Sequence, residues 1–476
     1  MSPESTIKDQ PSTIQEAEHT FVGFGFGPIQ AGLFAKEAFQ SGNFRRIVVA
    51  EIDPRLVEAV RANGGSYSVN IARNDRAETA RIEGVELLNP AHPEEAEALR
   101  AALSEATEIA TCLPSVKFYD TAADNSVAAL IAAGLQHRKT DATIVYAAEN
   151  HNHAAEILEQ AVAQRLPAQV GPPPSGVILS DRQPGAAVPQ HGRDARDTMG
   201  GTPMLRVQFL NTVIGKMSQV VTDPQEMAQR NLAPIAPGLD RAFLVEEFNR
   251  ILVNKTTIPA FVPGIGVFIE KDDLLPFEEA KLYGHNAIHA LLGFIGLLKG
   301  YTKMTELTSD APLMHVAREA FLRESGTALI RRHAALGDEL FTEAGYRHYA
   351  DDLLQRMTNP YLADTTARAA RDVVRKLGRQ DRIFGTMSLA LEHGIEPANL
   401  ALGAMAGIAL LLANAAEYGL PPELGALAWR QLNAHGLSSL LTWLWQDPVS
   451  PASSRLLDGT CAARVSLVHL LAHAHQ

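Results

Sequence analysis

The chain has 476 residues, more than one hydrophobic core usually supports, so its length favours two domains, or three. Its 46% hydrophobic and 20% charged residues are ordinary values for a globular protein and exclude a wholly disordered or fibrous chain. The formal net charge of −12 argues against non-specific binding to nucleic acid or anionic lipid, and favours a small-molecule partner.

The ends and the apolar stretches of the chain predict no secretory signal and no membrane span. Residues 1–20 are polar and charged without an apolar core, so we expect a disordered leader. Leu400 to Ala413 is too short to cross a bilayer and is rich in alanine and glycine, which predicts a buried helix. Cys112 and Cys461 lack metal-ligand spacing and predict two reduced core residues. We expect a cytoplasmic monomer or dimer without membrane or nucleic-acid partners.

Short apolar runs alternate with helical periodicity in the first part of the chain. Phe21 to Phe26 and Ile47 to Glu51 predict strands, with a helix at Ala31 to Phe39 between them. The alternation continues through two further strands and two alanine-rich helices: Glu108–Leu113, Ala142–Ala147, Pro93–Ser104 and Asn125–Ala133. This order predicts an α/β domain with a parallel, Rossmann-like sheet.

The composition changes after this alternation. Residues 166–203 are rich in Gly, Pro, Ser and Arg, with three successive prolines, and predict a long loop that could act as a mobile lid. Strand patterning returns at Leu205 to Val213 and Ala242 to Phe248, and beyond Leu274 the pattern is almost wholly helical. We therefore expect a Rossmann-like domain and then a mainly α-helical domain, at residues 21–272 and 273–476.

A glycine-rich turn follows the first predicted strand. Gly23, Gly25 and Gly27 end the strand, and Gly32 lies in the first helical turn, where backbone N–H groups can bind the pyrophosphate of a dinucleotide. Gln30 stands where the usual GxGxxG pattern has its third glycine. A merely tight strand-to-helix turn is therefore the alternative.

Glu51 ends the second predicted strand, 26 residues after Gly25. A carboxylate there can accept hydrogen bonds from the adenosine ribose and repels a 2′-phosphate, so we expect NAD rather than NADP. The nearby Arg55 weakens this preference. A solvated acid at a strand end is the alternative for Glu51.

The segment from Lys281 begins a predicted helix that continues through Leu298. At about 100° per residue, four polar side chains share one broad face of it: Lys281, His285, Asn286 and His289. Such groups need partners if they are buried on an apolar helix, and a cofactor and a polar substrate would supply them.

The histidines of the chain offer a metal site as an alternative. His285 and His289 are four residues apart, but they lack the glutamate of an HExxH pattern and an evident third ligand. His151 and His153 alternate along the chain and point apart in a strand, so a solvent-facing loop end is favoured. We therefore predict no metal.

These residues resemble the polyol-specific long-chain dehydrogenases and reductases, the family of mannitol dehydrogenase, mannitol-1-phosphate 5-dehydrogenase and the hexuronate reductases. Its signature, Lys-x4-Asn-x2-His, is met by Lys281, Asn286 and His289. The resemblance extends from Phe21 to about Leu412 and is weakest over residues 165–240.

The resemblance implies zinc-independent interconversion of a secondary alcohol and a ketone, with hydride passing to NAD and Lys281 acting as the base. Such a lysine needs a pKa near neutrality, which burial and nearby positive charge favour. Asn286 and Asn150 match two amides that donate to the developing oxyanion. His289 would orient the reacting oxygen.

A carboxylate before the lysine, Glu278 or Glu279, would relay its proton toward solvent. A second matching block begins at Asn359-Pro-Tyr-Leu-Ala-Asp364 and is similar to the mannitol-1-phosphate branch; it continues with Arg368, Arg371, Arg375, Lys376, Asp381 and Arg382.

Three cations of this block are candidates for substrate binding. Arg368 and Lys376 match family positions that contact the substrate chain, and Arg371 lies between them. Three cations suit a phosphate or a carboxylate, so we expect an anionic polyhydroxylated small molecule. The alternative is a solvated helix face paired to Asp364 or Asp372.

Two segments depart from the family pattern. The family's Val-Asp-Arg-Ile aligns with Ile214-Gly215-Lys216-Met217, which removes an aspartate that holds a substrate hydroxyl and leaves Lys216 as a candidate contact. The family's Thr-Ala-Val-Gly becomes Thr111-Cys112-Leu113-Pro114 beside the expected nicotinamide, with Thr111 as a candidate cofactor contact. We therefore expect a divergent member whose substrate is not a plain hexitol.

Three other functions stay open. Within the enzyme class, a reductase of a keto-sugar acid also needs cations for its carboxylate. A catalytically silent NAD(H)-binding sensor is suggested by Gln30, Pro114 and Gly215. A metal-dependent hydrolase comes third.

Overall fold

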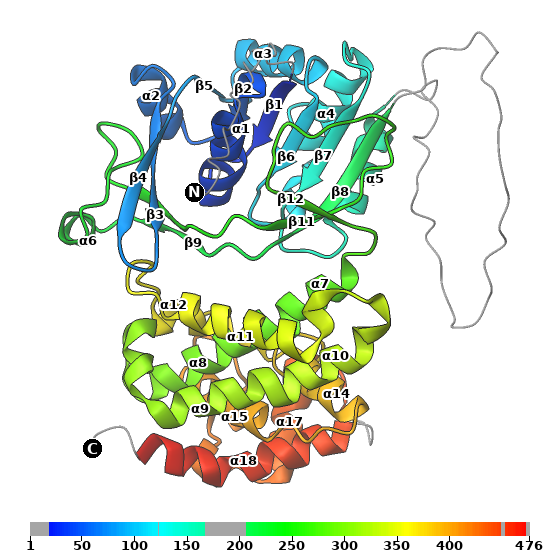
Figure 1. The fold of residues 1–476 in the computed structure, drawn as a ribbon. Helices are drawn as coiled ribbons and strands as arrows, with labels where there is room; N and C mark the ends of the chain where they lie inside the picture. The colour runs from blue at the N-terminus through cyan, green and yellow to red at the C-terminus, as the bar shows by residue number, and fades with distance from the viewer. Residues whose placement is uncertain (1–18, 122, 167–205, 449–452, 473–476) are drawn as a thin grey trace, which may run out of the picture. The chain divides into compact units, whose positions relative to one another are not determined.

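The computed structural model describes residues 19–121, 123–166, 206–448 and 453–472. The chain divides into two compact units, shown with their elements in Figure 1. The first unit comprises Met1–Asn70 and Thr79–Asp272, and the second comprises Ile71–Glu78 and Asp273–Gln476.

An eight-stranded sheet is the centre of the first unit, in the order β12-β11-β8-β7-β6-β1-β2-β5. Its strands are β1 (His19–Phe24), β2 (Phe44–Ala50), β5 (Val85–Leu88), β6 (Glu108–Thr111), β7 (Thr143–Ala147), β8 (Val207–Ile214), β11 (Ile251–Asn254) and β12 (Phe268–Lys271). The six strands in the order β5-β2-β1-β6-β7-β8 pair in parallel with their neighbours, and β11 pairs antiparallel to β8. The strand order reverses between β1 and β6, which confirms the predicted α/β class with a Rossmann-like sheet.

Helices connect these strands: η1 (Gln30–Phe34), α1 (Ala35–Ser41), α2 (Pro54–Ala62), α3 (Pro93–Ser104), α4 (Val127–Gln136) and α5 (Ala154–Arg165). A short 3-10 turn, η2 (Val116–Phe118), precedes α4. Residues in β6 and β7 are buried throughout, as the continuous apolar runs of a covered parallel sheet require. The predicted bounds of α3 are those observed.

A second sheet of the first unit has the order β4-β3-β10-β9. Its strands are β3 (Tyr67–Ala72), β4 (Ala77–Ile82), β9 (Ser218–Val221) and β10 (Ala242–Glu246), and α6 (Pro224–Gln229) lies between the last two in the chain. The turn between β3 and β4 groups with the second unit, where the Asn359 side-chain amide donates to the Arg73 carbonyl at 3.0 Å.

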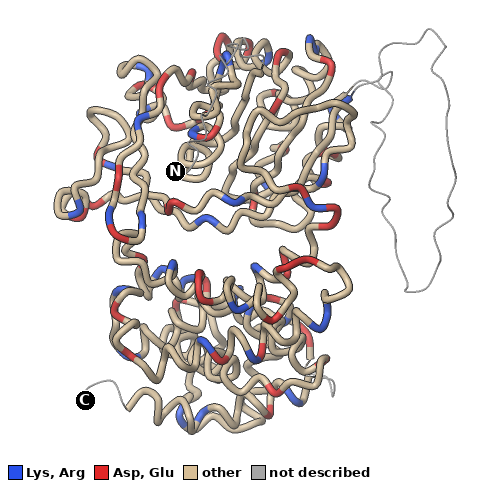
Figure 2. Tube along the Cα trace, in the orientation of Figure 1, with Lys and Arg blue, Asp and Glu red and all other residues tan. Residues whose placement is uncertain are grey.

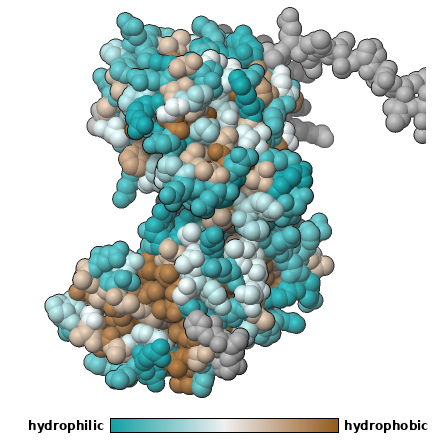
Figure 3. Space-filling view, turned by 90° about the vertical axis from the view of Figure 1, so that its left-hand side faces the viewer, coloured by the Kyte–Doolittle hydropathy of each residue, from teal (hydrophilic) through white to brown (hydrophobic). Residues whose placement is uncertain are grey.

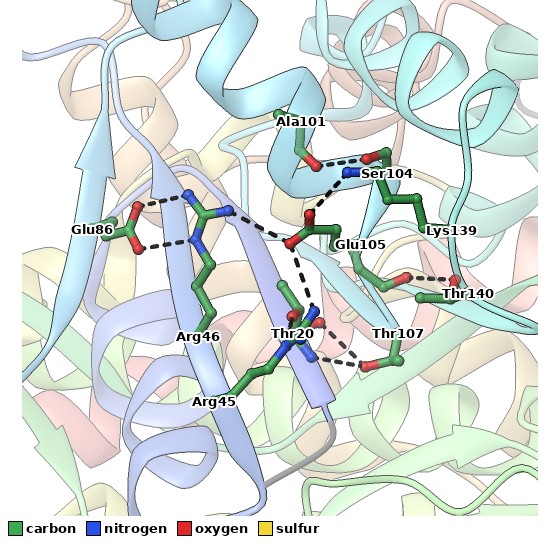
Figure 4. Close-up of polar contacts among 11 residues, drawn as sticks. Thr20, Arg45, Arg46, Glu86, Ala101, Ser104, Glu105, Thr107, Lys139 and Thr140 are labelled. Atoms are coloured by element: carbon green, nitrogen blue, oxygen red, sulfur yellow. Dashed lines mark hydrogen bonds and ion pairs between the residues drawn. The ribbon is translucent and has the colours of Figure 1, made fainter.

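Ion pairs cluster at the amino ends of the parallel strands, as Figure 4 shows. Arg46 on β2 makes two hydrogen bonds to the Glu86 carboxylate on β5, at 2.9 and 2.8 Å. Glu105, just after α3, accepts from Lys139 at 3.0 Å and lies 3.6 Å from Arg45. Each exposed pair contributes about 0–1 kcal/mol. The edge opposite the glycine-rich turn is thus charged and solvated.

The second unit is helical in its larger segment, as predicted. Its longer helical elements are α7 (Leu275–Glu279), η3 (Ala280–Asn286), α8 (Ala287–Leu298), η4 (Met304–Ser309), α9 (Ala311–Glu319), η5 (Ala320–Gly326), α10 (Thr327–His333), α11 (Glu343–Met357), α12 (Thr366–Ala370), α14 (Phe384–Glu392), α15 (Ala398–Ala413), α17 (Ala434–Trp445) and α18 (Ser454–Ala472). Shorter turns are η6 (Ala334–Leu336), η7 (Glu339–Phe341), α13 (Val373–Lys376), α16 (Pro422–Gly425) and η8 (Trp429–Gln431).

Helix α15 is the buried centre of this unit. Residues Leu400 to Leu412 are all buried, which confirms the buried helix predicted there. Gly403 and Gly407 lie against α8: a Cβ atom would be 3.1 Å from the Leu291 side chain at the first and 2.9 Å from the Phe294 ring at the second. Glycine therefore permits α15 to approach the helix that carries Lys281.

The surfaces of both units mix charges and apolar groups. Figure 2 shows basic and acidic residues interspersed along each unit. Figure 3 shows an apolar area on one face of the second unit, a feature typical of surfaces that contact other molecules. Within the described ranges, no helix is both long and apolar enough to cross a membrane.

Two predicted segments lie largely outside the described residues. The leader predicted at 1–20 has only His19 and Thr20 inside them, and both belong to β1. Of the loop predicted at 166–203, only Leu166 is described.

A matched pair of glycines tests the helix packing. At Gly134 in α4, an added Cβ would lie 2.3 Å from the Leu103 Cβ of α3, whereas at Gly459 in α18 it would meet no atom within 4 Å. We expect Gly134→Ala to destabilise the protein by about 1–3 kcal/mol through overpacking. Gly459→Ala should stabilise it by up to about 1 kcal/mol, because alanine is the better helix former. Chemical denaturation followed by circular dichroism measures both; equal effects of the two substitutions would contradict this packing.

Candidate active site

The glycine-rich turn lies at the carboxyl end of β1, beside β6. Gly25 has a φ of +79°, and a Cβ there would be 2.9 Å from the Cys112 carbonyl oxygen, so only glycine fits. A Cβ at Gly27 would meet no atom within 4 Å. The turn therefore combines tight backbone geometry with open space at the switch point of the sheet, where α/β folds bind their ligands.

Gln30 replaces a glycine without moving the helix away from the strand. Its buried side chain lies over Gly23 of β1: a Cβ at Gly23 would be 1.8 Å from the Gln30 Nε2 atom. The Gln30 amide has no hydrogen-bond partner within the described part of the chain. At Gly32 a Cβ would be 2.6 Å from Val245. The close packing of the strand and the helix therefore depends on two glycines, Gly23 in β1 and Gly32 in η1.

Glu51 is held at the end of β2 by backbone donors. Its carboxylate accepts hydrogen bonds from the N–H groups of Phe26 at 2.7 Å and of Ile52 and Asp53 at 2.8 Å. Arg55 is exposed and lies 3.7 Å from the Asp240 carboxylate. An oriented carboxylate therefore lies next to the glycine-rich turn, which is the position that a ribose hydroxyl would need.

Glu149 joins the carboxyl ends of β6 and β7. Its buried carboxylate accepts from the Thr111 hydroxyl at 2.9 Å, from the Leu113 N–H at 2.8 Å and from the Tyr119 hydroxyl. Burial raises the pKa of Glu149, while these hydrogen bonds oppose that rise. Thr111 is therefore held by a residue to which the sequence analysis gave no role, and the exposed Asn150 follows that residue in the chain.

Lys216 is the remaining candidate in the first unit. Its ammonium group donates to the Phe248 carbonyl at 2.8 Å and to the Asn249 amide oxygen at 2.6 Å, and the residue is buried. Gly215 beside it has the Phe248 ring 3.5 Å from a Cβ position. This lysine is anchored by backbone and amide oxygens.

Lys281 and Asn286 lie in the second unit, in a helix that runs from α7 through η3 to α8. The η3 segment, Ala280–Asn286, is a π-helical turn. Burial lowers the pKa of Lys281 to about 8; Glu278 opposes this shift and Arg382 adds to it. About a tenth of this amine is therefore unprotonated at pH 7, and about half at pH 8.

The two glutamates before Lys281 differ in their surroundings. Glu279 accepts hydrogen bonds from Arg332 at 3.1 Å and His333 at 2.7 Å. Glu278 is the carboxylate whose charge acts on the pKa of Lys281. Of the two relay candidates, Glu278 is the one coupled to the lysine.

His289 is oriented by Asp364. Its Nε2 lies 2.9 Å from the buried carboxylate, which also accepts from the Arg368 Nε at 2.5 Å. Burial would raise the pKa of Asp364, but His289 and Arg368 hold it well below its usual value. Burial lowers the pKa of His289, against the opposing effect of Asp364. A neutral His289 that donates from Nε2 leaves Nδ1 as an acceptor.

His285 is buried, and its pKa is far below the ordinary value because of that burial and the positive charge of Arg356. Its ring centroid lies 6.4 Å from that of His289. Across the described ranges, no group of three or more His, Cys, Asp or Glu side chains could hold a metal ion.

The three candidate substrate cations lie in different environments. Arg368 pairs with Asp364, while Lys376 is buried and donates to the Ala369 carbonyl at 2.6 Å. Burial lowers the pKa of Lys376 to about 7. Arg371 is 72% exposed in its side chain and only 3.8 Å from Asp372. These cations do not form one helix face, because the chain turns at Asp372, with a φ of +60°, between α12 and α13.

Arg382 is a further candidate that the sequence analysis quoted only within the matching block. It is buried, and its Nε donates to the Asp381 carboxylate at 2.8 Å. Its positive charge helps to lower the pKa values of Lys281, His285 and Lys376. The sequence does not predict this electrostatic role, because the effect depends on which residues the fold places near Arg382.

The candidate residues are therefore divided between the units. The first contains Gly25, Gly27, Gln30, Gly32, Glu51, Thr111, Asn150 and Lys216. The second contains Lys281, Asn286, His289, Arg368, Arg371 and Lys376.

Residues 273–423, which include all the candidates of the second unit, match the family of the mannitol dehydrogenase C-terminal domain. A mannitol-1-phosphate 5-dehydrogenase from Buchnera aphidicola subsp. Acyrthosiphon pisum (strain APS) is 25% identical over 389 residues, 80% of this chain and 83% of that protein. The two matches support a divergent relative of the mannitol dehydrogenases.

Solved structures share the fold of this chain at low identity. A D-sorbitol dehydrogenase in substrate-free form superposes with a TM-score of 0.70 at 16% identity, covering 98% of this chain and 96% of that one. The mannitol 2-dehydrogenase of Pseudomonas fluorescens, in a ternary complex with NAD and D-mannitol, gives 0.64 at 16% identity, covering 96% and 94%. The resemblance expected from Lys281, Asn286 and His289 is confirmed at the level of the family.

Two substitutions test the electrostatics of Lys281. Glu278→Gln should lower the pKa of Lys281 below about 8, because a carboxylate that favours the ammonium form is removed. Arg382→Met should raise it, because a repelling positive charge is lost. NMR titration of ¹⁵N-labelled lysine, assigned with Lys281→Arg, measures both shifts. Shifts in the same direction would contradict the assigned causes.

Proposed function

We propose that this protein is an NAD-dependent oxidoreductase that interconverts a secondary alcohol and a ketone on a polyhydroxylated substrate bearing a phosphate or carboxylate. The observation that carries the proposal is the amine of the partly buried Lys281, whose pKa desolvation lowers to about 8, on the helix of the matched family domain. The names of the relatives support a polyol substrate, and those at 25% identity support the phosphate. The NAD in the Pseudomonas fluorescens complex supports the choice of coenzyme.

The glycine-rich turn fits a dinucleotide. Gly25 and the open space at Gly27 allow a pyrophosphate to approach the backbone, and Glu51 presents a carboxylate to the adenosine ribose. That carboxylate repels a 2′-phosphate, so NAD is expected in preference to NADP. NAD, when bound, accepts the hydride from the carbinol carbon.

Lys281 acts as the base in the oxidation. As the C–H bond breaks and hydride leaves, the O–H proton passes to the Lys281 Nζ and the carbon–oxygen double bond forms. Glu278 then relays this proton toward solvent. In the reverse direction the Lys281 ammonium donates the proton to the ketone oxygen.

Three side chains act on the reacting oxygen or its neighbour. Asn286 and Asn150 donate to the negative charge that develops on oxygen. His289, fixed by Asp364, accepts through Nδ1 from the hydroxyl next to the reacting one and so orients the reacting oxygen. The two amide donors and the imidazole acceptor together favour a substrate whose hydroxyl groups are correctly placed, and they disfavour water in the same position.

The anionic group of the substrate binds Arg371. This guanidinium is exposed, whereas Arg368 is engaged by Asp364 and Lys376 by a backbone carbonyl. Arg368 and Lys376 contribute charge and shape beside it. A carboxylate satisfies the same cations, which leaves a keto-sugar-acid reductase as the second candidate within this chemistry.

Removal of the lysine tests the reaction. Lys281→Met should lower kcat for oxidation by about 100-fold or more, while the Kd for NADH stays within about twofold because Lys281 is outside the nucleotide-binding unit. In the wild type, oxidation should accelerate as the pH rises through about 8, because the free amine is the base. Absorbance at 340 nm and NADH fluorescence provide the two readouts.

The matched control is Lys303→Met, an exposed lysine of the same unit, which should leave the rate and its pH profile unchanged. Full activity in Lys281→Met would exclude the proposed base. NADH binding without turnover on any polyol, sugar phosphate or hexonate would favour the sensor instead.

The anion site is tested by Arg371→Leu. We expect this substitution to raise KM for D-mannitol 1-phosphate about tenfold or more, because a charge-assisted contact of about 1.5–3 kcal/mol is lost. KM for D-mannitol should change little. The exposed Arg347→Leu serves as the control. An equal effect of Arg371→Leu on both substrates would exclude this residue as the anion ligand.

A further inference from the structure

The π-helical turn brings two proposed catalytic side chains into line. In an α-helix, residues five apart diverge by about 140° around the axis. A π-helix joins residues five apart by its hydrogen bonds, so such residues follow one another on nearly the same side. Lys281 and Asn286 are five apart, and η3 spans them both. The turn therefore sets the base and the oxyanion donor on one side of the helix.

Hydroxyl groups from three other elements bind the backbone of this turn. The Tyr283 carbonyl accepts from the Ser325 hydroxyl of η5 at 2.8 Å. The Thr386 hydroxyl of α14 lies 3.2 Å from the same carbonyl and shares its one proton with the closer Arg382 carbonyl at 2.5 Å. The Ala280 carbonyl accepts from the Tyr349 hydroxyl of α11 at 3.4 Å. We call Ser325, Tyr349 and Thr386 the hydroxyl clamp. Its members lie 42 or more residues in sequence from the carbonyls that they contact, so the second unit must fold to assemble it.

Two glycines, Gly284 and Gly385, allow the residues around the π turn to pack closely against it. A Cβ at Gly284 would be 2.7 Å from the Tyr346 hydroxyl, which lies 3.2 Å from the Ser325 hydroxyl. A Cβ at Gly385 would be 2.8 Å from the Tyr283 ring. Two glycines thus allow the neighbouring elements to reach the backbone carbonyls. The contacts are part of the packing and are not made by flexible surface groups.

A change of helical register leaves a carbonyl without its ordinary partner. If buried and unsatisfied, such a group costs about 1–3 kcal/mol, which would favour return to an unbroken α-helix. The Ser325 hydroxyl donates to a carbonyl inside the turn, that of Tyr283, and so offsets a cost of this kind. Ser325 and Thr386 are both buried, so water does not readily replace them.

We propose that the hydroxyl clamp consists of positioning residues: it holds the π-helical turn, and the turn holds Lys281 and Asn286 in register for proton transfer and oxyanion stabilisation. The inference rests on the proposed function for its catalytic part. The structural part, that these hydroxyls maintain the π turn, can be tested without activity.

The test combines Ser325→Ala with Thr386→Val in the full-length chain. With D-mannitol 1-phosphate and NAD, kcat should fall roughly tenfold or more, with a larger solvent deuterium isotope effect because proton transfer becomes slower. KM and the Kd for NADH should change less than about twofold. Restoring the hydroxyl at the second position, as Ser325→Ala with Thr386→Ser, should recover part of kcat.

Thr460→Val is the matched control. Thr460 is a buried helical threonine that donates to the Leu456 carbonyl of its own helix at 2.7 Å. Its loss should leave kcat and the isotope effect unchanged. An equal fall of kcat in this control would show general destabilisation and overturn the positioning role.

A crystal structure of the double variant completes the test. We expect the segment 280–286 to relax to α-helical register and Asn286 to rotate away from Lys281. A retained π turn would overturn the inference, as would a lost turn with unchanged kcat. Full activity of Lys281→Met would instead overturn the proposed function, and the crystal structure would still decide whether the clamp maintains the turn.

Discussion

The desolvation of a partly buried amine on an apolar helix is the constraint on which the rest of the proposed site depends. A lysine ammonium loses hydration when it is enclosed by protein, so its free-amine form becomes accessible near neutral pH. Lys281 lies in such a place, and the buried positive charge of Arg382 moves its pKa in the same direction. Glu278 limits the shift. The balance leaves a group that can take and return a proton at the pH of ordinary metabolism.

The remaining polar groups of the second unit are arranged to tolerate this burial. Asp364 stays ionised because His289 and Arg368 both donate to it, and it fixes the imidazole in return. Lys376 is satisfied by a backbone carbonyl. In the proposed function, the Lys281 amine transfers the proton and the exposed Arg371 guanidinium binds the anionic group.

Much of the fold could be predicted from the sequence, because its strands are apolar runs buried on both faces. The strands β1, β2, β6 and β7 and the helix α15 fall where these patterns place them. The strands β3 and β4 went unnoticed because polar residues such as Asn70 and Thr79 interrupt them, and they pair in a separate small sheet. Their pairing is a tertiary contact that periodicity does not express.

The candidate site shows the same division. The residue types and spacing of Lys281, Asn286 and His289 identify them as candidates. Their directions around the helix are predicted only approximately by α-helical geometry, because no sequence pattern predicts the π turn. The sequence shows that Gln30 replaces a glycine, but not that its side chain packs on Gly23 of β1. The roles of Glu149 and Arg382 depend on contacts and fields between distant segments. The sequence therefore predicts the residue types of the site, but it does not predict the contacts and charge effects between distant segments.

The central claim is that this chain oxidises a polyhydroxylated alcohol by hydride transfer to NAD while Lys281 takes the proton. The most direct measurement is the fate of the carbinol hydrogen: D-mannitol 1-phosphate deuterated on carbon is oxidised with NAD, and the mass of the reduced coenzyme is recorded. The account predicts one deuterium in each NADH formed. Reduced coenzyme without deuterium, with the label released to water, would contradict it.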